Sequence, residues 1–262
     1  YYRGSVSNNY VYFANAYWRI IRLNGDGSVR LFYAGTTPNA TGNELNISTS
    51  SFNNINNSPA YVGFMYGSTI NQSYELNTKN EVDSTIKTRL DSWYEEKIIA
   101  NNLESYIADS GFCNDRRVNN GEGIDANSQT SYQALRRMQN YIPTLLCANQ
   151  NDLFTVSNPK GNQALTYPIG LITIDETSYA GMAFKFINSL SYISTFSEYS
   201  YYTMSPAIFE LSYRASRMWA VSNKYDYNHV TVSEGVRPVI NLNGNVEISS
   251  GIGTSSDPYV IK

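Results

Sequence analysis

Hydrophobic and polar residues alternate near the start of the chain in a pattern typical of strands. Residues 10–23 (YVYFANAYWRIIRL) are rich in aromatic and β-branched residues around a short polar break. The sequence NGDG at 24–27 is a strong turn signal, and residues 29–33 alternate again as a return strand. The pattern therefore predicts a β-hairpin over residues 10–33.

A helical period replaces the alternation from about residue 83, where Asp83 or Ser84 can cap a first turn. Lys87 and Arg89 are expected on the solvated face of this helix, among acidic residues. Shorter helices are predicted at 103–108, 131–138 and 175–181. The apolar face of the main helix follows spacings of three and four and consists of Ile86, Leu90, Trp93, Tyr94 and Ile98.

The rest of the chain predicts a long loop followed by short strands. Residues 35–60 are polar and are expected to form a surface loop, and residues 61–66 a short buried strand or turn. The strand at 199–204 should end at Ser205-Pro206, and residues 223–228 should form a turn. Strands are predicted at 151–156, 199–204, 217–221, 230–232 and 235–242, with a turn and a last strand in the tail 243–262.

This order of elements favours one α+β domain over residues 1–262. A strand pair comes first, helices follow, and many short strands close the chain. A length of 262 residues lies within the range of one large β-rich domain. We therefore expect early helices packed on short, mostly antiparallel strands, with long irregular loops.

Composition favours a binding protein. Charged residues make up 16 % of the chain, against about 25 % in typical soluble domains. The chain has 23 Tyr and 10 Phe, and Tyr combines a large apolar ring with a hydroxyl group that can meet a ligand. The alternative is that Tyr simply fills strands, where it is favoured.

Charge and hydropathy exclude two classes of partner. The net charge is −3, and no more than two Lys or Arg residues are adjacent, so a nucleic-acid partner is not expected. No apolar run approaches the roughly 20 residues of a membrane span. The opening YYRG is neither a Met start nor a signal peptide, which indicates a piece of a longer precursor or a mature form.

The two cysteines, Cys113 and Cys147, predict one disulfide, with two buried free thiols as the alternative. In the chain-entropy model such a bridge contributes roughly 3–4 kcal/mol. The cysteines lack C-x-x-C spacing and the chain has one His, so we expect no metal site and no cofactor.

Four motifs carry a family resemblance: YWRIIR at 17–22, the helix at 86–94 with Trp93, YTMSP at 202–206, and GVRPVINL at 235–242. Their order resembles an uncharacterised family of bacterial extracellular domains, in which Tyr202 is often Trp. That family is similar to the C-type-lectin-like fold of formylglycine-generating enzyme and of phage and bacterial variable receptors. The tail GTSSDPYVI resembles an ending common in Gram-positive surface proteins. The resemblance implies a secreted or cell-wall-displayed domain of a larger protein.

Catalytic candidates are few. No residue matches the late copper-binding cysteine pair of formylglycine-generating enzyme, and the calcium-lectin strings EPN, QPD and WND are absent. The single histidine, His229, lies in an expected turn without a G-x-S-x-G motif. Asp175-Glu176 and Glu95-Glu96 are adjacent residues, which point in different directions on a helix and form no glycosidase couple. We therefore expect a non-catalytic protein.

Arg237 lies beside Pro238 in an otherwise apolar late stretch. A buried guanidinium needs a partner, so we expect Arg237 to be structural and to pair with a carboxylate such as Asp175, Glu176 or Asp91. The alternative is that Arg237 clamps a ligand.

The ligand-binding surface is predicted within residues 196–229, which are rich in Tyr, Arg and Asn. The ligand is expected to be a glycan or a protein on a host or neighbouring cell, and a structural spacer domain is the alternative. Residues 225–229 (YDYNH) have codons that differ only in the first base, which fits a retroelement-diversified receptor and also an AT-rich genome. Trp18, Trp93, Tyr202 and Trp219 are expected to be structural. The predicted ligand contacts, all in loops, are Tyr213, Arg214, Tyr225, Tyr227, Asn228 and His229.

Overall fold

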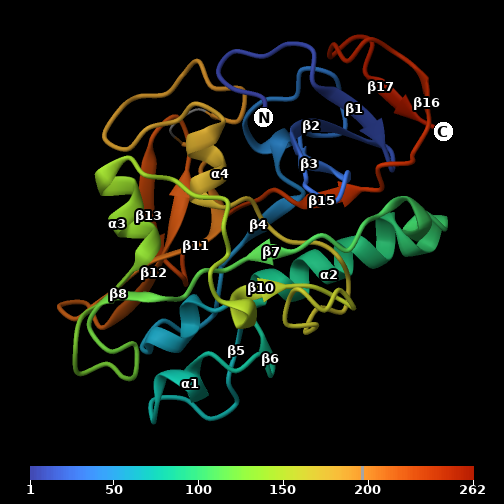
Figure 1. Cartoon of the computed structure of the whole chain (residues 1–262). Coiled ribbons are helices and arrows are strands. Elements are labelled where there is room, and N and C mark those ends of the chain that lie inside the picture. The colour runs from blue at the N-terminus through green and yellow to red at the C-terminus, as the bar shows by residue number, and fades with distance from the viewer. Residues whose placement is uncertain (196–197) are drawn as a thin grey trace.

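Both ends of the chain build the first sheet of the protein (Figure 1). The computed structural model describes residues 1–195 and 198–262. The predicted hairpin is confirmed: β1 (Tyr10–Phe13), β2 (Ala16–Leu23) and β3 (Val29–Tyr33) are antiparallel neighbours. The sheet is completed by β15 (Val239–Leu242) beside β3, and by β17 (Tyr259–Ile261) and β16 (Ile248–Ser250) beside β1.

The tail 243–262 therefore carries two strands where one was predicted. β17 pairs in parallel with β1, through Val11 opposite Tyr259, and β16 pairs antiparallel with β17. The C-terminal segment thus extends the sheet that the N-terminal hairpin begins.

The second sheet contains most of the remaining strands. Its order is β13 (Tyr225–His229), β12 (Ala215–Val221), β11 (Tyr201–Glu210), β14 (Glu234–Val236) and β4 (Ser48–Ser50). The hairpin of β8 (Val118–Asn120) and β9 (Thr130–Tyr132) adds to β11. Two further pairs are small: β7 (Phe112–Cys113) with β10 (Leu153–Phe154), and β5 (Met65–Tyr66) with β6 (Val82–Asp83).

Several predicted boundaries in this region are wrong. β11 does not end at Ser205-Pro206 but continues to Glu210, because register shifts on both sides of Pro206 accommodate the missing N–H. Residues 225–229 form the edge strand β13 rather than a turn, and the tight turn lies at 222–224. Residues 230–232 then form a turn instead of the predicted strand. The predicted loop at 35–60 contains β4, and the strand predicted at 151–156 shrinks to β10.

The main helix, α2 (Thr85–Lys97), forms as predicted, and the Ser84 hydroxyl caps it by accepting a hydrogen bond from the Lys87 N–H. The other α-helices are α1 (Tyr74–Asn77), α3 (Gln133–Asn140) and α4 (Ile174–Tyr179). Single 3-10 turns span Gly42–Leu45, Pro59–Val62, Ile99–Asn101, Glu104–Tyr106 and Gln150–Asp152. The helix predicted at 103–108 is thus only a 3-10 turn.

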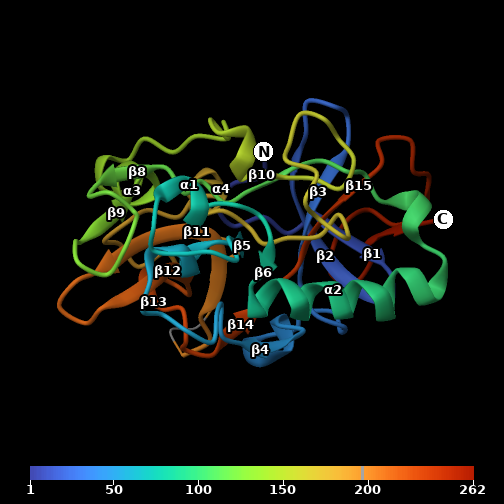
Figure 2. The same cartoon turned by 90° about the horizontal axis from the view of Figure 1, so that it is seen from below.

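Helix α2 lies along one face of the first sheet (Figure 2). The ring of Trp93 packs against Trp18 at 5.8 Å and Tyr33 at 6.1 Å, and both Trp18 and Trp93, for which structural roles were predicted, are buried. Lys87 was expected in solvent but is buried, and its ammonium group lies 3.0 Å from Asp83 and 2.7 Å from Asp91. Burial is tolerated there because both flanking turns of the helix supply a carboxylate.

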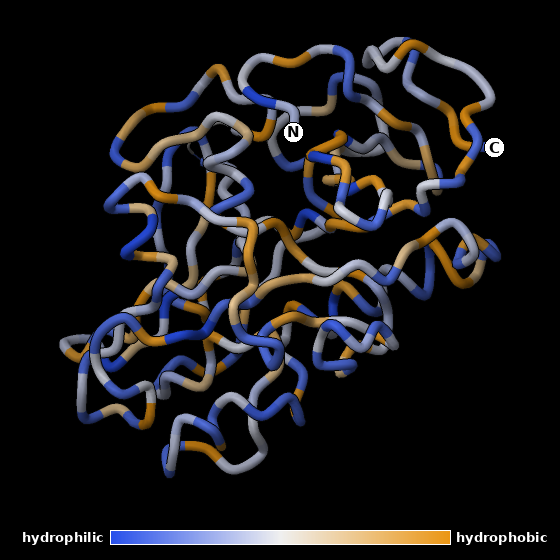
Figure 3. The backbone as a smooth tube through the Cα atoms, in the orientation of Figure 1, coloured by the Kyte–Doolittle hydropathy of each residue, from blue (hydrophilic) through white to orange (hydrophobic). Residues whose placement is uncertain are grey.

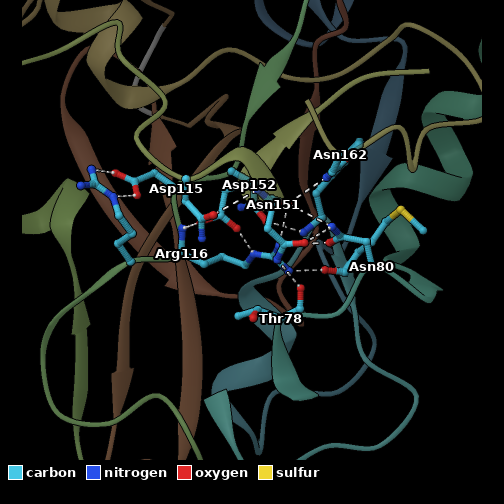
Figure 4. A network of polar contacts seen from close by, with 12 residues as sticks. Thr78, Asn80, Asp115, Arg116, Asn151, Asp152 and Asn162 are labelled. Carbon is cyan, nitrogen blue, oxygen red and sulfur yellow. Dashed lines mark hydrogen bonds and ion pairs between the residues drawn. The ribbon is translucent and has the colours of Figure 1, made fainter. Parts of the chain in front are cut away.

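A buried ion pair between Arg116 and Asp152 lies in the network of polar contacts that Figure 4 shows. Arg116 donates from Nε to Asp152 Oδ1 at 2.6 Å and from its backbone N–H to Oδ2 at 2.9 Å. Its Nη2 donates to the Asn80 side chain at 3.0 Å, and neither charged side chain has appreciable exposure. Each charge is therefore neutralised by its partner, as buried charges usually are.

The predicted disulfide is present: Cys113 in β7 is bonded to Cys147, with 5.7 Å between their Cα atoms.

Hydrophobic residues occur in short stretches separated by hydrophilic ones along the whole backbone (Figure 3). Among the helices in the part of the chain that the structure describes, none has the length and apolar character of a membrane span.

Candidate functional site

The structure separates the residues predicted to contact a ligand. Tyr225 is buried, and its hydroxyl hydrogen-bonds those of Thr177 at 2.7 Å and Ser178 at 3.0 Å, so its predicted place on the surface is wrong. Tyr225, Tyr227 and His229 share one face of β13, and the end of the strand that carries Tyr225 lies against α4. Tyr213 and Arg214 lie in the turn between β11 and β12, where Tyr213 is 65 % exposed.

A smaller aromatic cluster lies on the same face of β12 and β13, at the end nearer the turn that carries Tyr213. The guanidinium of Arg217 lies over the rings of Tyr213 at 5.4 Å and Tyr227 at 6.0 Å, and Tyr213 also contacts His229. Burial lowers the pKa of His229, with Arg217 adding to the effect. Asn228 is engaged elsewhere, since its side chain donates to Glu234 at 2.5 Å. Residues 196 and 197 of the predicted surface lie outside the described residues.

Trp219 and Tyr202 are fully buried, as predicted for structural residues. The Tyr202 hydroxyl donates to the backbone carbonyls of His229 at 2.7 Å and Val232 at 2.9 Å, which fixes the turn after β13. The predicted ion pair between Arg237 and a carboxylate is wrong, as the contacts of Arg237 show.

Arg237 is buried, but its partners are neutral. Its Nε and Nη2 donate to the Tyr33 carbonyl at 3.2 and 2.9 Å, and its Nη1 donates to the Ile193 carbonyl at 3.4 Å. The guanidinium is stacked between the rings of Phe32 at 3.9 Å and Tyr201 at 4.9 Å. The three expected carboxylates already have other partners: Asp91 pairs with Lys87, Asp175 with Arg137, and Glu176 with Arg30.

Arg19 is a second guanidinium of the same kind. It is buried, and it donates from Nε to Asn9 Oδ1 and from Nη2 to the Val6 carbonyl, each at 2.5 Å. The rings of Tyr10 and Tyr192 cover it at 4.0 and 4.8 Å. Within residues 1–195 and 198–262, no carboxylate lies within ion-pairing distance of Arg19 or Arg237.

Both guanidiniums line one cavity of about 240 Å³, which we call the Arg19–Arg237 cavity. It lies where the first sheet meets the segment 189–195 and the turn at Asn223 between β12 and β13. The cavity is lined by Tyr10, Arg19, Ala34, Ala40, Thr41, Gly42, Leu45, Ser189, Tyr192, Ser194, Thr195, Asn223 and Arg237.

Strand register explains why these side chains meet. Tyr10 is opposite Arg19 across β1 and β2, and Arg19 is opposite Phe32 across β2 and β3. Residues opposite one another point to the same face, so rings and cations alternate across the sheet. Trp18, the neighbour of Arg19, points to the other face and packs under α2. The strand register thus places Trp18 in the core under α2 and Arg19 on the face that lines the cavity.

Backbone hydrogen bonds hold the outer wall in place. The Asn188 N–H donates to the Asn223 carbonyl at 2.6 Å, and the Tyr192 N–H donates to the Gly4 carbonyl at 3.0 Å. Gly42 closes the opposite side with a φ of 56°, a conformation that favours glycine. These contacts join four distant parts of the chain around the cavity.

The charged side chains that line the cavity, Arg19 and Arg237, are both positive. Burial lowers the pKa of Arg237 to about 10, and the neighbouring charge of Arg19 adds to the fall. Burial also lowers the pKa of Arg19. Both groups still carry a positive charge at neutral pH. Buried charges are normally paired with an opposite charge, and the salt bridges of the described residues include neither Arg19 nor Arg237.

Sequence reasoning missed Arg19 because YWRIIR was taken as a strand motif as a whole. The available signal was the cation itself, one residue from Trp18 in a strand otherwise suited to burial. Arg237 was singled out, but its environment was predicted incorrectly. Apart from Tyr10 in β1 and Tyr192, the remaining wall residues are Ala, Thr, Gly, Leu, Ser and Asn outside the strands, and no sequence pattern distinguishes them.

A second, smaller cavity of about 60 Å³ collects acidic side chains beside the disulfide. Asp115 lies 2.6 Å and Asp175 2.7 Å from Arg137, and Glu176 Oε1 lies 2.6 Å from Arg30 and also contacts Arg22. Burial by itself would raise the pKa values of Asp115 and Glu176, but the arginines outweigh it and hold both below their usual values. The Asp115 and Glu176 carboxylates therefore stay ionised and paired at neutral pH, so they cannot donate a proton there.

The described residues contain no group of three or more His, Cys, Asp or Glu side chains placed to hold a metal ion. Asp175 and Glu176 lie in the first turn of α4, which begins at Ile174, one residue before the predicted start, with Thr173 as the cap. No protein-family model, curated protein or solved structure matches the chain.

Proposed function

We propose that this chain is a non-catalytic ligand-binding domain of a bacterial surface or secreted protein, and that it binds an anionic ligand in the Arg19–Arg237 cavity. One observation carries the proposal. Two buried guanidiniums line a cavity of about 240 Å³ with no carboxylate partner in the described parts of the chain. An anion there would supply the missing negative charge in a site shielded from water.

The proposed location outside the cell has independent support. A disulfide such as Cys113–Cys147 is typical of oxidising compartments. The resemblance of the GTSSDPYVI tail to endings of Gram-positive surface proteins agrees with display on a cell wall. The C-type-lectin-like arrangement is part of this proposal, supported by the order of early helix α2 and late strands β11 to β15.

A binding role is favoured over catalysis because the candidate proton-transfer groups are engaged. The acidic side chains that converge beside the disulfide are each paired with arginine. His229 contacts the side chain of Asn56 at 3.3 Å and packs against Tyr213 rather than a carboxylate. Neither arrangement provides a base beside a nucleophile.

A second contact surface is favoured by the exposed Tyr213 ring, which Arg217 and Tyr227 support. Exposed aromatic residues with Arg are the usual anchors of protein and glycan contacts. A glycan and host-protein array compares the wild type with a Tyr213→Ala/Tyr227→Ala pair. Loss of signals in the pair would support this surface, whereas identical profiles would exclude it. A spacer domain would bind nothing on the array.

The decisive experiment measures anion binding by calorimetry and thermal shift. Acetate, phosphate and sulfate are titrated into the wild type and into Arg19→Gln and Arg237→Gln. We expect at least one anion to bind in a saturable manner and each substitution to weaken binding about tenfold or more. Arg136→Gln, at an exposed position on α3, removes the same charge elsewhere and should change nothing. Absence of saturable binding by any anion would refute the proposal.

A further inference from the structure

The chemistry of the Arg19–Arg237 cavity narrows the class of its ligand, provided that the proposed function holds. Three features bear on the ligand: the size of the cavity, the number of guanidinium N–H groups still available, and the polar groups on the remaining wall. All three are properties of residues that the structure describes.

Size limits the ligand to a small unit. The cavity holds about 240 Å³, whereas pockets for drug-sized molecules span roughly 300–1,000 Å³. The wall segments are fixed by backbone hydrogen bonds at Asn188 and Tyr192. A single ring with its substituents can enter, whereas a folded peptide or several sugar units cannot.

The guanidiniums use part of their N–H donors within the protein. Arg19 already donates from Nε and Nη2 to Asn9 and Val6, and Arg237 donates from Nε and Nη2 to Tyr33. The remaining terminal nitrogen of Arg237 makes only a long bond of 3.4 Å to Ile193. A guanidinium has five N–H groups, so about three remain on Arg19 and about two on Arg237, all of them on terminal nitrogens.

The kind of donor in the cavity, side-chain guanidinium groups without a row of backbone N–H groups, favours a carboxylate over a phosphate or sulfate group. A carboxylate has two oxygens, and one N–H from each arginine can reach them. A phosphate group presents three oxygens that need strong donors, and phosphate sites usually supply a row of backbone N–H groups. The Arg19–Arg237 cavity includes no helix N-terminus longer than a single 3-10 turn.

The rest of the wall suits hydroxyl groups on a small carbon ring. Ser189 and Ser194 contribute hydroxyls, and Asn223 contributes an amide that can both donate and accept. Ala34 and Leu45 provide apolar surface. Sugars combine these two kinds of surface, with hydroxyls at the rim of the ring and C–H groups on its faces.

From these features we infer that the Arg19–Arg237 cavity binds one carboxylated sugar unit, such as a uronic acid. The carboxylate lies between Arg19 and Arg237, and the ring hydroxyls face Ser189, Ser194 and Asn223. The cavity recognises the carboxylate by its charge and the sugar ring by hydrogen bonds to the polar wall residues.

The test titrates D-glucuronate and D-galacturonate into the protein, with D-glucose, acetate and phosphate as comparisons. We expect at least one uronate to bind about tenfold or more tightly than both glucose, which lacks the acid, and acetate, which lacks the ring. Arg19→Gln and Arg237→Gln should each lose this preference over glucose. Arg136→Gln should keep it.

A second variant avoids dependence on buried residues. Asn223→Asp places a negative charge on the wall at a partly exposed turn that should fold normally. It should weaken uronate binding about tenfold or more by repulsion. Asn223→Ala should weaken uronate binding severalfold and leave acetate binding unchanged.

The outcomes separate this inference from the proposed function. If phosphate or acetate binds but neither uronate does, the anion site stands and the sugar assignment is wrong. If glucose binds as tightly as the uronates, the carboxylate is not recognised and the inference is also wrong. If no anion binds at all, both the inference and the proposed function fail.

Discussion

Replacing Arg237 by methionine tests the central claim, that its buried charge has no counter-charge. A fall in pKa from 12.5 to about 10 corresponds to about 3 kcal/mol of unfavourable free energy for carrying the charge in the folded state. Methionine fills similar space without a charge, so Arg237→Met relieves this cost.

The substitution also removes favourable contacts. Hydrogen bonds to the carbonyls of Tyr33 and Ile193 are worth about 1 kcal/mol each, and stacking on Phe32 and Tyr201 contributes about 1–2 kcal/mol. Gains and losses nearly cancel. We expect Arg237→Met to change the free energy of unfolding by less than about 1.5 kcal/mol.

Arg116 provides the matched control, because it is equally buried but paired with Asp152 (Figure 4). Arg116→Met leaves the Asp152 carboxylate buried without its cation, which should cost about 3–5 kcal/mol. The two substitutions remove the same group from similar depth and differ in the charge left behind.

The assay is urea unfolding followed by tryptophan fluorescence, with the wild type and both variants at neutral pH. Midpoints and slopes give the free energy of unfolding for each protein. If Arg237→Met is destabilised as much as Arg116→Met, the charge of Arg237 is compensated in the folded protein. The reasoning behind the anion site would then be refuted.

Three further predictions concern other parts of the fold. Cys147→Ser should lower the free energy of unfolding by about 3–4 kcal/mol, because the bridge to Cys113 closes a loop over 34 residues; reductant should do the same to the wild type and nothing to the variant. In the same urea assay, Trp18→Phe should lower the free energy of unfolding by about 1 kcal/mol more than Trp219→Phe does. The Trp18 N–H donates to a carbonyl at 3.0 Å, whereas that of Trp219 has no partner among the described residues. Equal losses of stability would contradict this prediction. Arginines hold the pKa of Asp115 below its usual value despite burial, so its contribution is present above pH 3.8 and lost as the pH falls further. Asp115→Asn should be less stable at pH 7 and lose less stability between pH 5 and pH 2, and parallel curves would argue against it.

The local pattern of the sequence was sufficient for the elements with strong signals. The NGDG turn between two alternating segments gave the hairpin of β2 and β3, and the spacing of Ile86, Leu90 and Trp93 gave α2. The α+β class followed from the order of these elements. The disulfide was predicted from the number of cysteines and the expected compartment.

Weak or mixed signals led to errors. Polar Asp226 and Asn228 indicated a turn, but β13 lies at the edge of its sheet, where polar side chains can face solvent. Pro206 indicated a strand end, but irregular pairing on both sides lets β11 continue. In both cases the neighbouring strand decided the conformation, and a neighbour distant in sequence leaves no local pattern.

The candidate site shows most clearly which features follow from local sequence patterns and which from contacts between distant segments. By itself the sequence determined that Arg237 lies in a buried apolar stretch, although the strand predicted at 235–242 is interrupted there between β14 and β15. It also determined that Arg19 points away from the face of Trp18 once β2 forms. Only the tertiary structure decided that Asp91, Asp175 and Glu176 pair with other cations. It also brought Arg19 and Arg237, 218 positions apart, to one cavity. Secondary structure depends on contacts close in the chain, whereas charge pairing depends on which distant segments pack together, and burial decides how strongly each charge needs a partner.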